Sequence, residues 1–493
     1  MVGALDAYQA ALAACPDDPD LLAALAELAA RIELHEVAAK LWRQVSALQP
    51  ERLEAADGQA RALRELGRFD EAVALLRETL MAHPEEPRLW NTLGVTLAQQ
   101  GDSELALTFL DEAVRLDPGF AVALHNRGGA RFDLGQLEAA AADFQAAGKL
   151  ARKPADRAMI EFAAATLKLA QGKLAEGWDA YEARFSPDLS FSVVFDAPGR
   201  PWTPKTPLAG RRLLVLAEQG LGDEIMFANM LPDVLHDLGA DGRLALAVEP
   251  RLVELFARSF PAAEVSAHAT ERTGPHPRRH APGVSDPSSV ELWAPMGSLA
   301  RKHRRDLTAF PTASGYLTPD PVRVAHWRAW LGEGPPAIGL TWRSGKLLGD
   351  RRRQYPALED WAVVMRSPGV RFVNVQYGDC GEELKALSEM AGREVLQPPG
   401  LDIRNQIDDL AALLAALDFV ISVPNATGAL AGAVGAPLAI IGGPAAWSRL
   451  GTSGHPWYPR ARALVPARFG DWRPMLEQAA ELARHRGRTE PTR

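Results

Sequence analysis

The order of apolar and polar residues divides the chain near residue 200. Before that point, small residues recur every 34 positions, a period typical of stacked helical hairpins. From Arg211 onward, short apolar runs such as LLVLA (213–217) alternate with amphipathic stretches, which is typical of parallel α/β units. We therefore expect a helical array over residues 1–185 and an α/β region that begins near residue 200.

The helical part carries three kinds of residue at the 34-residue period. Alanine suits the places where two helices cross closely, glycine suits the tight turn between them, and proline stops one hairpin and opens the next. The residues are Ala4, Ala38, Ala72, Ala106 and Ala140; Gly67, Gly101 and Gly135; and Pro16, Pro50, Pro84 and Pro118. Together with Trp90, Leu93, Gly94 and Ala113, this set resembles the tetratricopeptide repeat (TPR).

The resemblance implies full units at 19–52, 53–86, 87–120 and 121–154, followed by a degenerate pair at 155–185. Residues 1–18 fit the second helix of an earlier unit, so we expect the chain to begin mid-repeat. Arrays of this kind present a concave face that holds peptides. The first helix of each hairpin lines that groove, and a spacer or dimerisation stalk is the alternative role. The groove residues expected to bind an acceptor are Asn91, Thr92, His125 and Asn126.

The α/β region divides into two sets of strands, at 200–320 and 321–493. In the first set we expect strands at 213–217, 244–248 and near 290, and helices at 223–238 and about 250–259. In the second we expect strands at 337–342, 370–376, 419–423 and 438–441, and helices near 359–366, 382–391, 408–417, 427–434 and 472–486. Two Rossmann-like halves facing a cleft form the GT-B architecture, with ligands beyond the carboxyl ends of the strands.

Two segments of the second part have a simpler expected role. Residues 268–289 are rich in Pro, His, Arg and Ser and show no periodicity, so we expect a surface loop. Trp178, Tyr181 and Phe185 lie at helical spacing just before the α/β region, and we expect this stripe to pack against it.

Composition and charge narrow the functional classes. The chain has 493 residues, 47% of them hydrophobic and 24% charged, as in ordinary globular proteins. Residues 1–150 hold 13 Lys+Arg and 24 Asp+Glu, a balance of −11, and the remaining residues carry +3, which gives the net charge of −8. An acidic first third joined to a near-neutral remainder argues against a duplex-DNA binder. The two distant cysteines form no metal-ligand pattern, and neither a signal peptide nor a membrane span is visible. We expect a cytoplasmic protein that needs no metal or cofactor.

The segment EQGLGDE (218–224) joins a strand to a helix. Gly220 and Gly222 let a substrate approach the backbone, and a helix N-terminus favours negative charge. Asp223 has two interpretations that the sequence leaves open. It caps the helix, or it is a general base that takes a proton from an acceptor hydroxyl.

Two other strand ends carry polar residues. Arg343 and Lys346 follow the first strand of the second set, where two cations suit a phosphate leaving group and a solvated basic loop is the alternative. Asn425, Thr427 and Gly428 lie in a small-residue turn before a helix. Backbone N–H groups and the Thr427 hydroxyl suit a diphosphate there, and close helix packing is the alternative.

Four segments together resemble bacterial TPR-containing glycosyltransferases that modify flagellin, a group akin to the ADP-heptose:lipopolysaccharide heptosyltransferases. They are EQGLGDEIMFA (218–228), IGLTWRSG (338–345), VNVQYGD (373–379) and LAALDFVISVPNATGALAGAVGAP (414–437), and GWDAYEARF (177–185) and HPWYP (455–459) fit the same group. The resemblance implies Asp223 as the catalytic base. It implies donor binding by Gly220, Gly222, Arg343, Ser344, Lys346, Gln376, Asn425, Thr427 and Gly428.

The chain departs from the heptosyltransferases at one turn. Those enzymes commonly carry an acid and a histidine where this chain has Asn425 and Ala429. The departure favours a different nucleotide sugar, such as a CMP-linked acid, or an inactive domain.

The function expected from the sequence is that of an inverting, metal-independent protein O-glycosyltransferase. It would transfer a sugar, such as a nonulosonic acid, from a nucleotide donor to a protein such as flagellin that the TPR array recruits. Two alternatives remain: a TPR scaffold with an inactive GT-B domain, and a transferase that acts on glycolipid in lipopolysaccharide assembly.

Overall fold

The computed structural model describes residues 17–313, 315–345 and 354–486. Within these ranges, residues 17–160 form one compact unit, and residues 161–345 and 355–486 form a second. Residues 1–16 of the helix expected over residues 1–18 lie outside the described residues. The predicted donor residue Lys346 also lies outside them.

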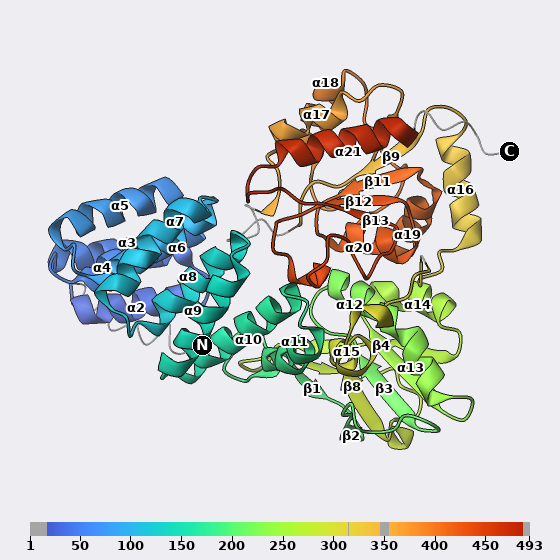
Figure 1. Ribbon diagram of the computed structural model, residues 1–493, viewed down its shortest axis with the longest axis horizontal. Coiled ribbons are helices and arrows are strands. Elements are labelled where there is room, and N and C mark those ends of the chain that lie inside the picture. The colour runs from blue at the N-terminus through green and yellow to red at the C-terminus, as the bar shows by residue number, and fades with distance from the viewer. Residues whose placement is uncertain (1–16, 314, 346–353, 487–493) are drawn as a thin grey trace. The chain divides into compact units, whose positions relative to one another are not determined.

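The first unit contains four helical hairpins (Figure 1). Its helices are α2 (Pro19–Arg31), α3 (His35–Leu48), α4 (Leu53–Glu65), α5 (Phe69–Ala82), α6 (Pro87–Gln100), α7 (Ser103–Leu116), α8 (Ala121–Asp133) and α9 (Leu137–Leu150). The first helix of each pair begins at residue 19, 53, 87 or 121, and these are the first residues of the four units expected from the period.

The periodic alanines and glycines of the described hairpins occupy the kinds of position that the sequence predicted for them. Ala38, Ala72, Ala106 and Ala140 are fully buried where the helices cross. Gly67, Gly101 and Gly135 have φ angles of 75°, 114° and 73°, a left-handed conformation that residues with a Cβ rarely adopt. The hairpin thus repeats because its turn and its crossing point are both chemically specified.

The division between the two units falls within α10 (Pro154–Ala170). The helix α11 (Leu174–Tyr181) and the 3₁₀ helix η1 (Glu182–Phe185) therefore belong to the second unit. Trp178 is 1% exposed and packs edge-on against Phe227 and Trp457, with ring centroids 6.3 and 6.0 Å away. The predicted packing of this aromatic stripe against the α/β region is confirmed for Trp178 and for Tyr181.

The first sheet of the second unit is parallel throughout, in the order β2 (Arg200–Pro201), β8 (Leu292–Pro295), β3 (Arg212–Leu216), β4 (Arg243–Val248) and β5 (Ala263–Ala267). One face packs on α12 (Leu221–Phe227) and α13 (Leu231–Leu238) in the larger core. The single helix expected over 223–238 is wrong. Pro232 near the start of α13 has no N–H to continue the ladder, and a 3₁₀ turn, η2 (Ala228–Met230), separates the two helices.

Residues 268–289 are not the plain surface loop expected from their composition. They contain β6 (Ala269–Glu271) and β7 (Arg278–His280), which pair with β1 (Val194–Asp196) in a small mixed sheet. Val284 also packs, with Val290, against the face of the first sheet that the helices leave uncovered. Strands of three residues are too short to show periodicity, so the sequence pattern missed a segment that the sheet needs for its burial.

The second sheet is also parallel, in the order β10 (Arg371–Asn374), β9 (Ala337–Leu340), β11 (Phe419–Ser422), β12 (Leu438–Ile441) and β13 (Ala461–Leu464). The edge strand β13 and the helix α16 (Pro321–Leu331) were not expected from the sequence. The other helices are α14 (Val253–Ser259) and α15 (Ala300–His303) beside the first sheet, and α17 (Ala362–Met365), α18 (Gly381–Ala391), α19 (Ile407–Ala416), α20 (Ala426–Ala433) and α21 (Arg473–Arg486) beside the second.

Alternate residues of the second sheet belong to two different cores. Ile421 faces the core formed with α17, α18 and α21, whereas Val420 faces α19 and α20 (Figure 1). The second of these cores is continuous with that of the first sheet. The two sheets therefore share one apolar core, and the helices α12 and α20 lie inside it. Among the described residues, no helix combines the length and apolarity that crossing a membrane requires.

Candidate functional site

Strand order locates a binding crevice in each sheet. Chain order in the second sheet reverses between β9 and β11, and in the first sheet between β3 and β8. In open α/β sheets, ligands bind beyond the carboxyl ends of the strands at such a switch point. All three polar motifs from the sequence follow β3, β9 or β11.

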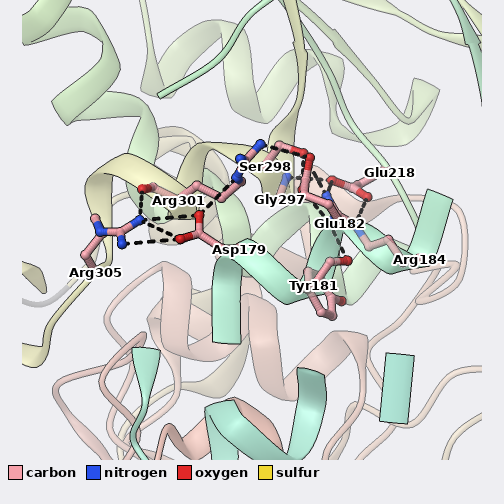
Figure 2. A network of polar contacts seen from close by, with 9 residues as sticks. All are labelled: Asp179, Tyr181, Glu182, Arg184, Glu218, Gly297, Ser298, Arg301 and Arg305. Carbon is pink, nitrogen blue, oxygen red and sulfur yellow. Dashed lines mark hydrogen bonds and ion pairs between the residues drawn. The ribbon is translucent and has the colours of Figure 1, made fainter. Parts of the chain in front are cut away.

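A buried ion pair lies at the switch point of the first sheet (Figure 2). Arg184, from η1, donates from Nε and Nη2 to the carboxylate of Glu218 at 2.8 and 2.9 Å. The two side chains are 3% and 2% exposed. Gly297 N–H also donates to Glu218 Oε1 at 2.7 Å, so both sides of the switch point hold this carboxylate.

The ion pair continues into a wider polar network (Figure 2). Arg184 also donates to Glu182 Oε1 at 2.8 Å and to Ser298 Oγ at 3.0 Å. At the edge of the network, Asp179 accepts from Arg301 and Arg305 at 3.3 Å, where Asp179 and Arg305 are nearly half exposed. The network ties α11 and η1 to the ends of β3 and β8.

Glu224 is engaged by a second set of buried partners. Its carboxylate accepts from Glu249 N–H at 2.9 Å and lies 3.2 Å from His268 Nε2 and 3.7 Å from Arg279 Nη1. His268 and Arg279 both come from the segment that the sequence analysis read as a loop. Glu224 therefore anchors that segment to the motif.

Asp223 is the third residue of α12, and the N-cap is Gly220. The expectation that Asp223 is the capping residue itself is therefore wrong by position. Its Oδ2 accepts from Gly220 N–H at 3.1 Å, as the third residue of a capping box does. The side chain is partly exposed and lies close enough to Tyr181 and Tyr458 to raise the pKa of both phenols, although burial is the larger cause.

The backbone is strained next to Asp223. Gln219 is not a glycine, yet its φ is 61°, in the left-handed region. Its side-chain amide exchanges hydrogen bonds with Tyr181 Oη at 2.8 and 3.3 Å. Strained residues of this kind concentrate at functional sites, where the surrounding structure holds them.

Asn425 connects two of the predicted donor motifs. Its Oδ1 accepts from Gly428 N–H at 2.9 Å and so caps α20. Its Nδ2 donates to Thr341 Oγ1 at 2.7 Å and to the Arg343 carbonyl at 3.0 Å. Thr427, in the first turn of α20, is buried and donates to the Val375 carbonyl at 3.3 Å.

Gln376 fixes the backbone of the loop after β9. Its Oε1 accepts from Thr341 Oγ1 and from the N–H groups of Trp342 and Arg343 at 3.0 to 3.1 Å. The side chain is buried. Gln376, predicted to bind the donor, thus acts in this structure on the loop itself.

The guanidinium of Arg343 is occupied by the chain's own acid. It donates to both oxygens of Glu383 at 2.7 to 2.9 Å and to the Asp379 carbonyl at 2.7 Å. The hydrogen bonds to Glu383 raise the pKa of Arg343 further. Ser344 lies 3.3 Å from Tyr377 Oη. The positive charge predicted for donor phosphate is therefore neutralised before any ligand binds.

The first and third motifs meet. A Cβ built on Gly222 lies 3.4 Å from Ala426 Cα, so the first turns of α12 and α20 are in van der Waals contact. The structure thus brings together Gly220, Gly222, Asp223, Ser344, Gln376, Asn425, Thr427 and Gly428 at facing strand ends, with Arg343 held by Glu383. Within the described ranges, no group of three or more His, Cys, Asp or Glu side chains is arranged to bind a metal ion.

The segment HPWYP, given no role by the sequence analysis, lies beside this site. Trp457 is fully buried against Trp178, and its Nε1 donates to the Ser448 carbonyl at 3.0 Å. The ring of Tyr458 occupies the space that a Cβ on Gly432 of α20 would need. A Pro-rich segment between strands carries no periodicity, and only its aromatic residues hinted at burial.

The predicted acceptor residues lie on α6 and α8, the first helices of two successive hairpins of the first unit. Asn126 Nδ2 donates to Asn91 Oδ1 at 2.8 Å, and Thr92 donates to the buried carboxylate of Asp57. The two residues of each pair are 35 positions apart, so the Asn91–Asn126 pair lies one 34-residue repeat after the Asp57–Thr92 pair. The ring of His125 lies 5.6 Å from that of Phe144, and its Nδ1 is buried without a hydrogen-bond partner.

A family model matches part of the first unit, and one relative covers most of the chain. Residues 58–119 match the tetratricopeptide repeat family. The molecule is therefore a TPR protein in which helical repeats precede an α/β region of parallel sheets. It is 47% identical to Protein FlbA of Caulobacter vibrioides over 482 residues, which cover 97% of this chain and 81% of FlbA. The chain belongs to the FlbA family.

Two solved structures are each similar to about a third of this chain. A thermophilic TPR protein of Thermus thermophilus is 24% identical, with 33% of this chain and 88% of that chain covered and a TM-score of 0.31. Yeast Tom70 is 19% identical, with 36% and 38% covered and a TM-score of 0.31.

Breaking the ion pair at the first switch point should destabilise the second unit. In Glu218→Gln, Arg184 stays buried without its main counter-charge, a situation that costs about 3–5 kcal/mol. Urea unfolding measures the loss. The matched control is Arg305→Gln, which removes an exposed ion pair and should cost no more than about 1 kcal/mol. Equal costs for the two variants would contradict this account.

His125 should make stability depend on pH. Burial lowers its pKa to about 4, against the opposing attraction of Asp156, so the folded chain binds this proton later than the unfolded chain with its ordinary pKa of 6.5. The free energy of unfolding should therefore fall as pH drops from about 6.5 to about 4.

His125→Gln should reduce that slope, as measured by urea midpoints at pH 7 and 4.5. His303 and His455, whose pKa values burial also lowers to about 4, would keep the rest of it. Identical slopes in the variant and the unaltered chain would count against a neutral, buried His125.

Proposed function

We propose that this protein is a glycosyltransferase of GT-B architecture that moves a sugar from a nucleotide donor to a protein recruited by its TPR repeats. The observation that carries the proposal is the contact between α12 and α20 at Gly222 and Ala426. It brings the strand ends of two doubly wound sheets to one place, where a donor on one sheet can meet an acceptor on the other.

The second sheet is the better donor half. Its switch point carries hydrogen-bonding groups on loops after β9 and β11, and the capped N-terminus of α20 favours a negative group. The switch point of the first sheet is filled by Arg184 and Glu218. The first sheet therefore contributes the rim of the site, with Asp223 on it.

Asp223 is the best candidate for the base. An inverting transfer needs a carboxylate that removes a proton from the acceptor hydroxyl as it attacks the sugar carbon. Of the three acids in the motif, Glu218 and Glu224 are buried, whereas Asp223, which accepts from Gly220 N–H, is partly exposed. The proton thus has a reachable acceptor at the end of β3.

The TPR unit supports recruitment of a protein acceptor. Its first helices carry polar side chains at two adjacent repeat positions, Asn91 and His125 at one and Thr92 and Asn126 at the next, of which His125 and Asn126 are partly exposed. Flagellin is the acceptor that we propose, on the sequence resemblance given above.

A non-enzymatic scaffold is the second candidate, and two observations favour it. Glu383 neutralises Arg343, and the chain has Asn425 at the N-cap of α20 and Ala429 within that helix where heptosyltransferases carry an acid and a histidine. In this alternative the α/β region keeps its fold for packing and the TPR repeats perform the function.

Intact-mass measurement of flagellin tests the proposal. Flagellin from a strain that lacks this gene should lose a sugar mass, and the unaltered gene should restore it. An unchanged flagellin mass with altered lipopolysaccharide would instead support a transferase acting on glycolipid. Unchanged masses of both would support the scaffold.

Asp223→Asn separates a structural from a catalytic role of this carboxylate. Asparagine keeps an oxygen that accepts from Gly220 N–H, so the melting temperature should barely move. Loss of a general base typically costs about 10²–10⁴-fold in rate, and turnover should fall by that order. Glycosylated acceptor is measured by intact mass beside a thermal melt.

The control is Asp241→Asn, at an exposed turn of the same half. Its turnover should equal that of the unaltered chain. Near-normal turnover of Asp223→Asn would leave Asp223 with its role in the capping box alone.

A further inference from the structure

The loop that follows β12 contains a partly buried arginine that has no counter-charge among the described residues. Arg449, at the end of the 3₁₀ helix η9 (Trp447–Arg449), donates to the carbonyls of Pro444 and Thr452. Its Nε is buried and has no hydrogen-bond partner. Among the described residues, no carboxylate lies within ion-pair distance of it.

Burial alone acts on this guanidinium and lowers its pKa. The neighbouring titratable group is His455, whose pKa burial and the charge of Arg449 lower to about 4. His455 is therefore neutral at pH 7 and supplies no negative charge. A guanidinium has five N–H donors, and two backbone carbonyls leave it far from satisfied.

A charge that is partly withdrawn from water and has no counter-charge costs folding free energy. A ligand anion can supply the missing charge, and groups with a perturbed pKa are more frequent at functional sites. Leu450, the next residue, has a φ of 55°, so the backbone that presents Arg449 is strained as well.

The position of this loop connects it to the candidate site. β12 lies beside β11 in the sheet, so the loop leaves the same carboxyl edge as the Asn425 turn. Trp447 packs on Trp178 and Tyr181 at 6.2 and 5.6 Å between ring centroids. The ring of His455 lies 6.3 Å from that of Tyr458, the phenol that senses the charge of Asp223.

The contrast with Arg343 decides between the two arginines. Arg343 already holds Glu383 through three short hydrogen bonds. A ligand anion would have to displace that acid, whereas at Arg449 it would supply a charge that the described part of the chain does not.

We propose that Arg449 binds the negatively charged group of the ligand in this site and that, of the two described arginines at this sheet edge, it rather than Arg343 is the one that holds the ligand. The inference rests on the proposed function for the identity of the ligand, an anionic nucleotide sugar. The group that it holds is a phosphate of the donor or a carboxylate of the sugar. Both accept paired hydrogen bonds from a guanidinium.

The test uses full-length chains and three probes: inorganic phosphate, CMP and free N-acetylneuraminic acid, which carries a carboxylate but no phosphate. Affinity comes from calorimetry, and thermal melts are recorded with and without each probe. The variants are Arg449→Gln and Arg449→Lys. Arg371→Gln is the matched control, because Arg371 also donates to two backbone carbonyls, those of Leu331 and Pro335, but lies at the amino end of β10.

Arg449→Gln should bind the effective probe about 10- to 150-fold more weakly, the equivalent of one charge-assisted hydrogen bond, with the ligand-free melting temperature unchanged or higher. Arg371→Gln should bind as the unaltered chain does. A loss for phosphate and CMP assigns Arg449 to the donor phosphate, and a loss for N-acetylneuraminic acid alone assigns it to the sugar carboxylate.

Equal affinity of Arg449→Gln and the unaltered chain for every probe would overturn the proposal, and so would an unaltered chain that binds none of them. If Arg449→Gln does not fold, Arg449→Lys decides: it should lose affinity several-fold because lysine lacks the paired donors, and unchanged affinity overturns the proposal. Anion binding that depends on Arg449 in a chain that glycosylates nothing would keep this inference and reject the enzymatic function.

Discussion

The buried ion pair between Arg184 and Glu218 is the contact on which the arrangement of the second unit depends. Glu218 lies two residues beyond the end of β3, at the start of the motif that carries Asp223, and Arg184 belongs to the helical segment that precedes the sheets. Because neither charge can be left alone in the interior, β3, β8 and η1 must keep their positions together. The aromatic cluster around Trp178 then fills the space beside the pair, so a polar constraint and an apolar one act at the same junction.

Much of this fold follows from the sequence. Glycine is required at the left-handed turns, alanine where helices cross, and β-branched or leucine runs in buried parallel strands. Those requirements made the four hairpins and the main strands readable. The small sheet at 269–280 and the strand β13 were not readable, because short, partly exposed strands have no period and are set by tertiary contacts.

The candidate site was predictable in its location and less so in its chemistry. Strand ends carry the motifs, as doubly wound topology requires. The sequence could not show that Glu383 forms an ion pair with Arg343, or that Gln376 hydrogen-bonds the loop after β9, because those partners come from other segments. Nor could it show the neighbourhood of Arg449, since a missing counter-charge is visible only when all surrounding groups are in place.

Glycine at either of the two strained residues beside the site would relieve backbone strain but would remove a different stabilising contact. Gln219 is exposed, so glycine there would release about 1–3 kcal/mol of backbone strain at little cost in packing. The same change would leave the buried Tyr181 hydroxyl without its hydrogen bonds to the Gln219 amide, which costs about 1–3 kcal/mol and offsets the relief. Leu450 is fully buried, and the cavity left by glycine would outweigh the relief. Both strained residues are therefore held by their own side chains, through a hydrogen bond on the Asp223 side of the site and through apolar burial on the Arg449 side.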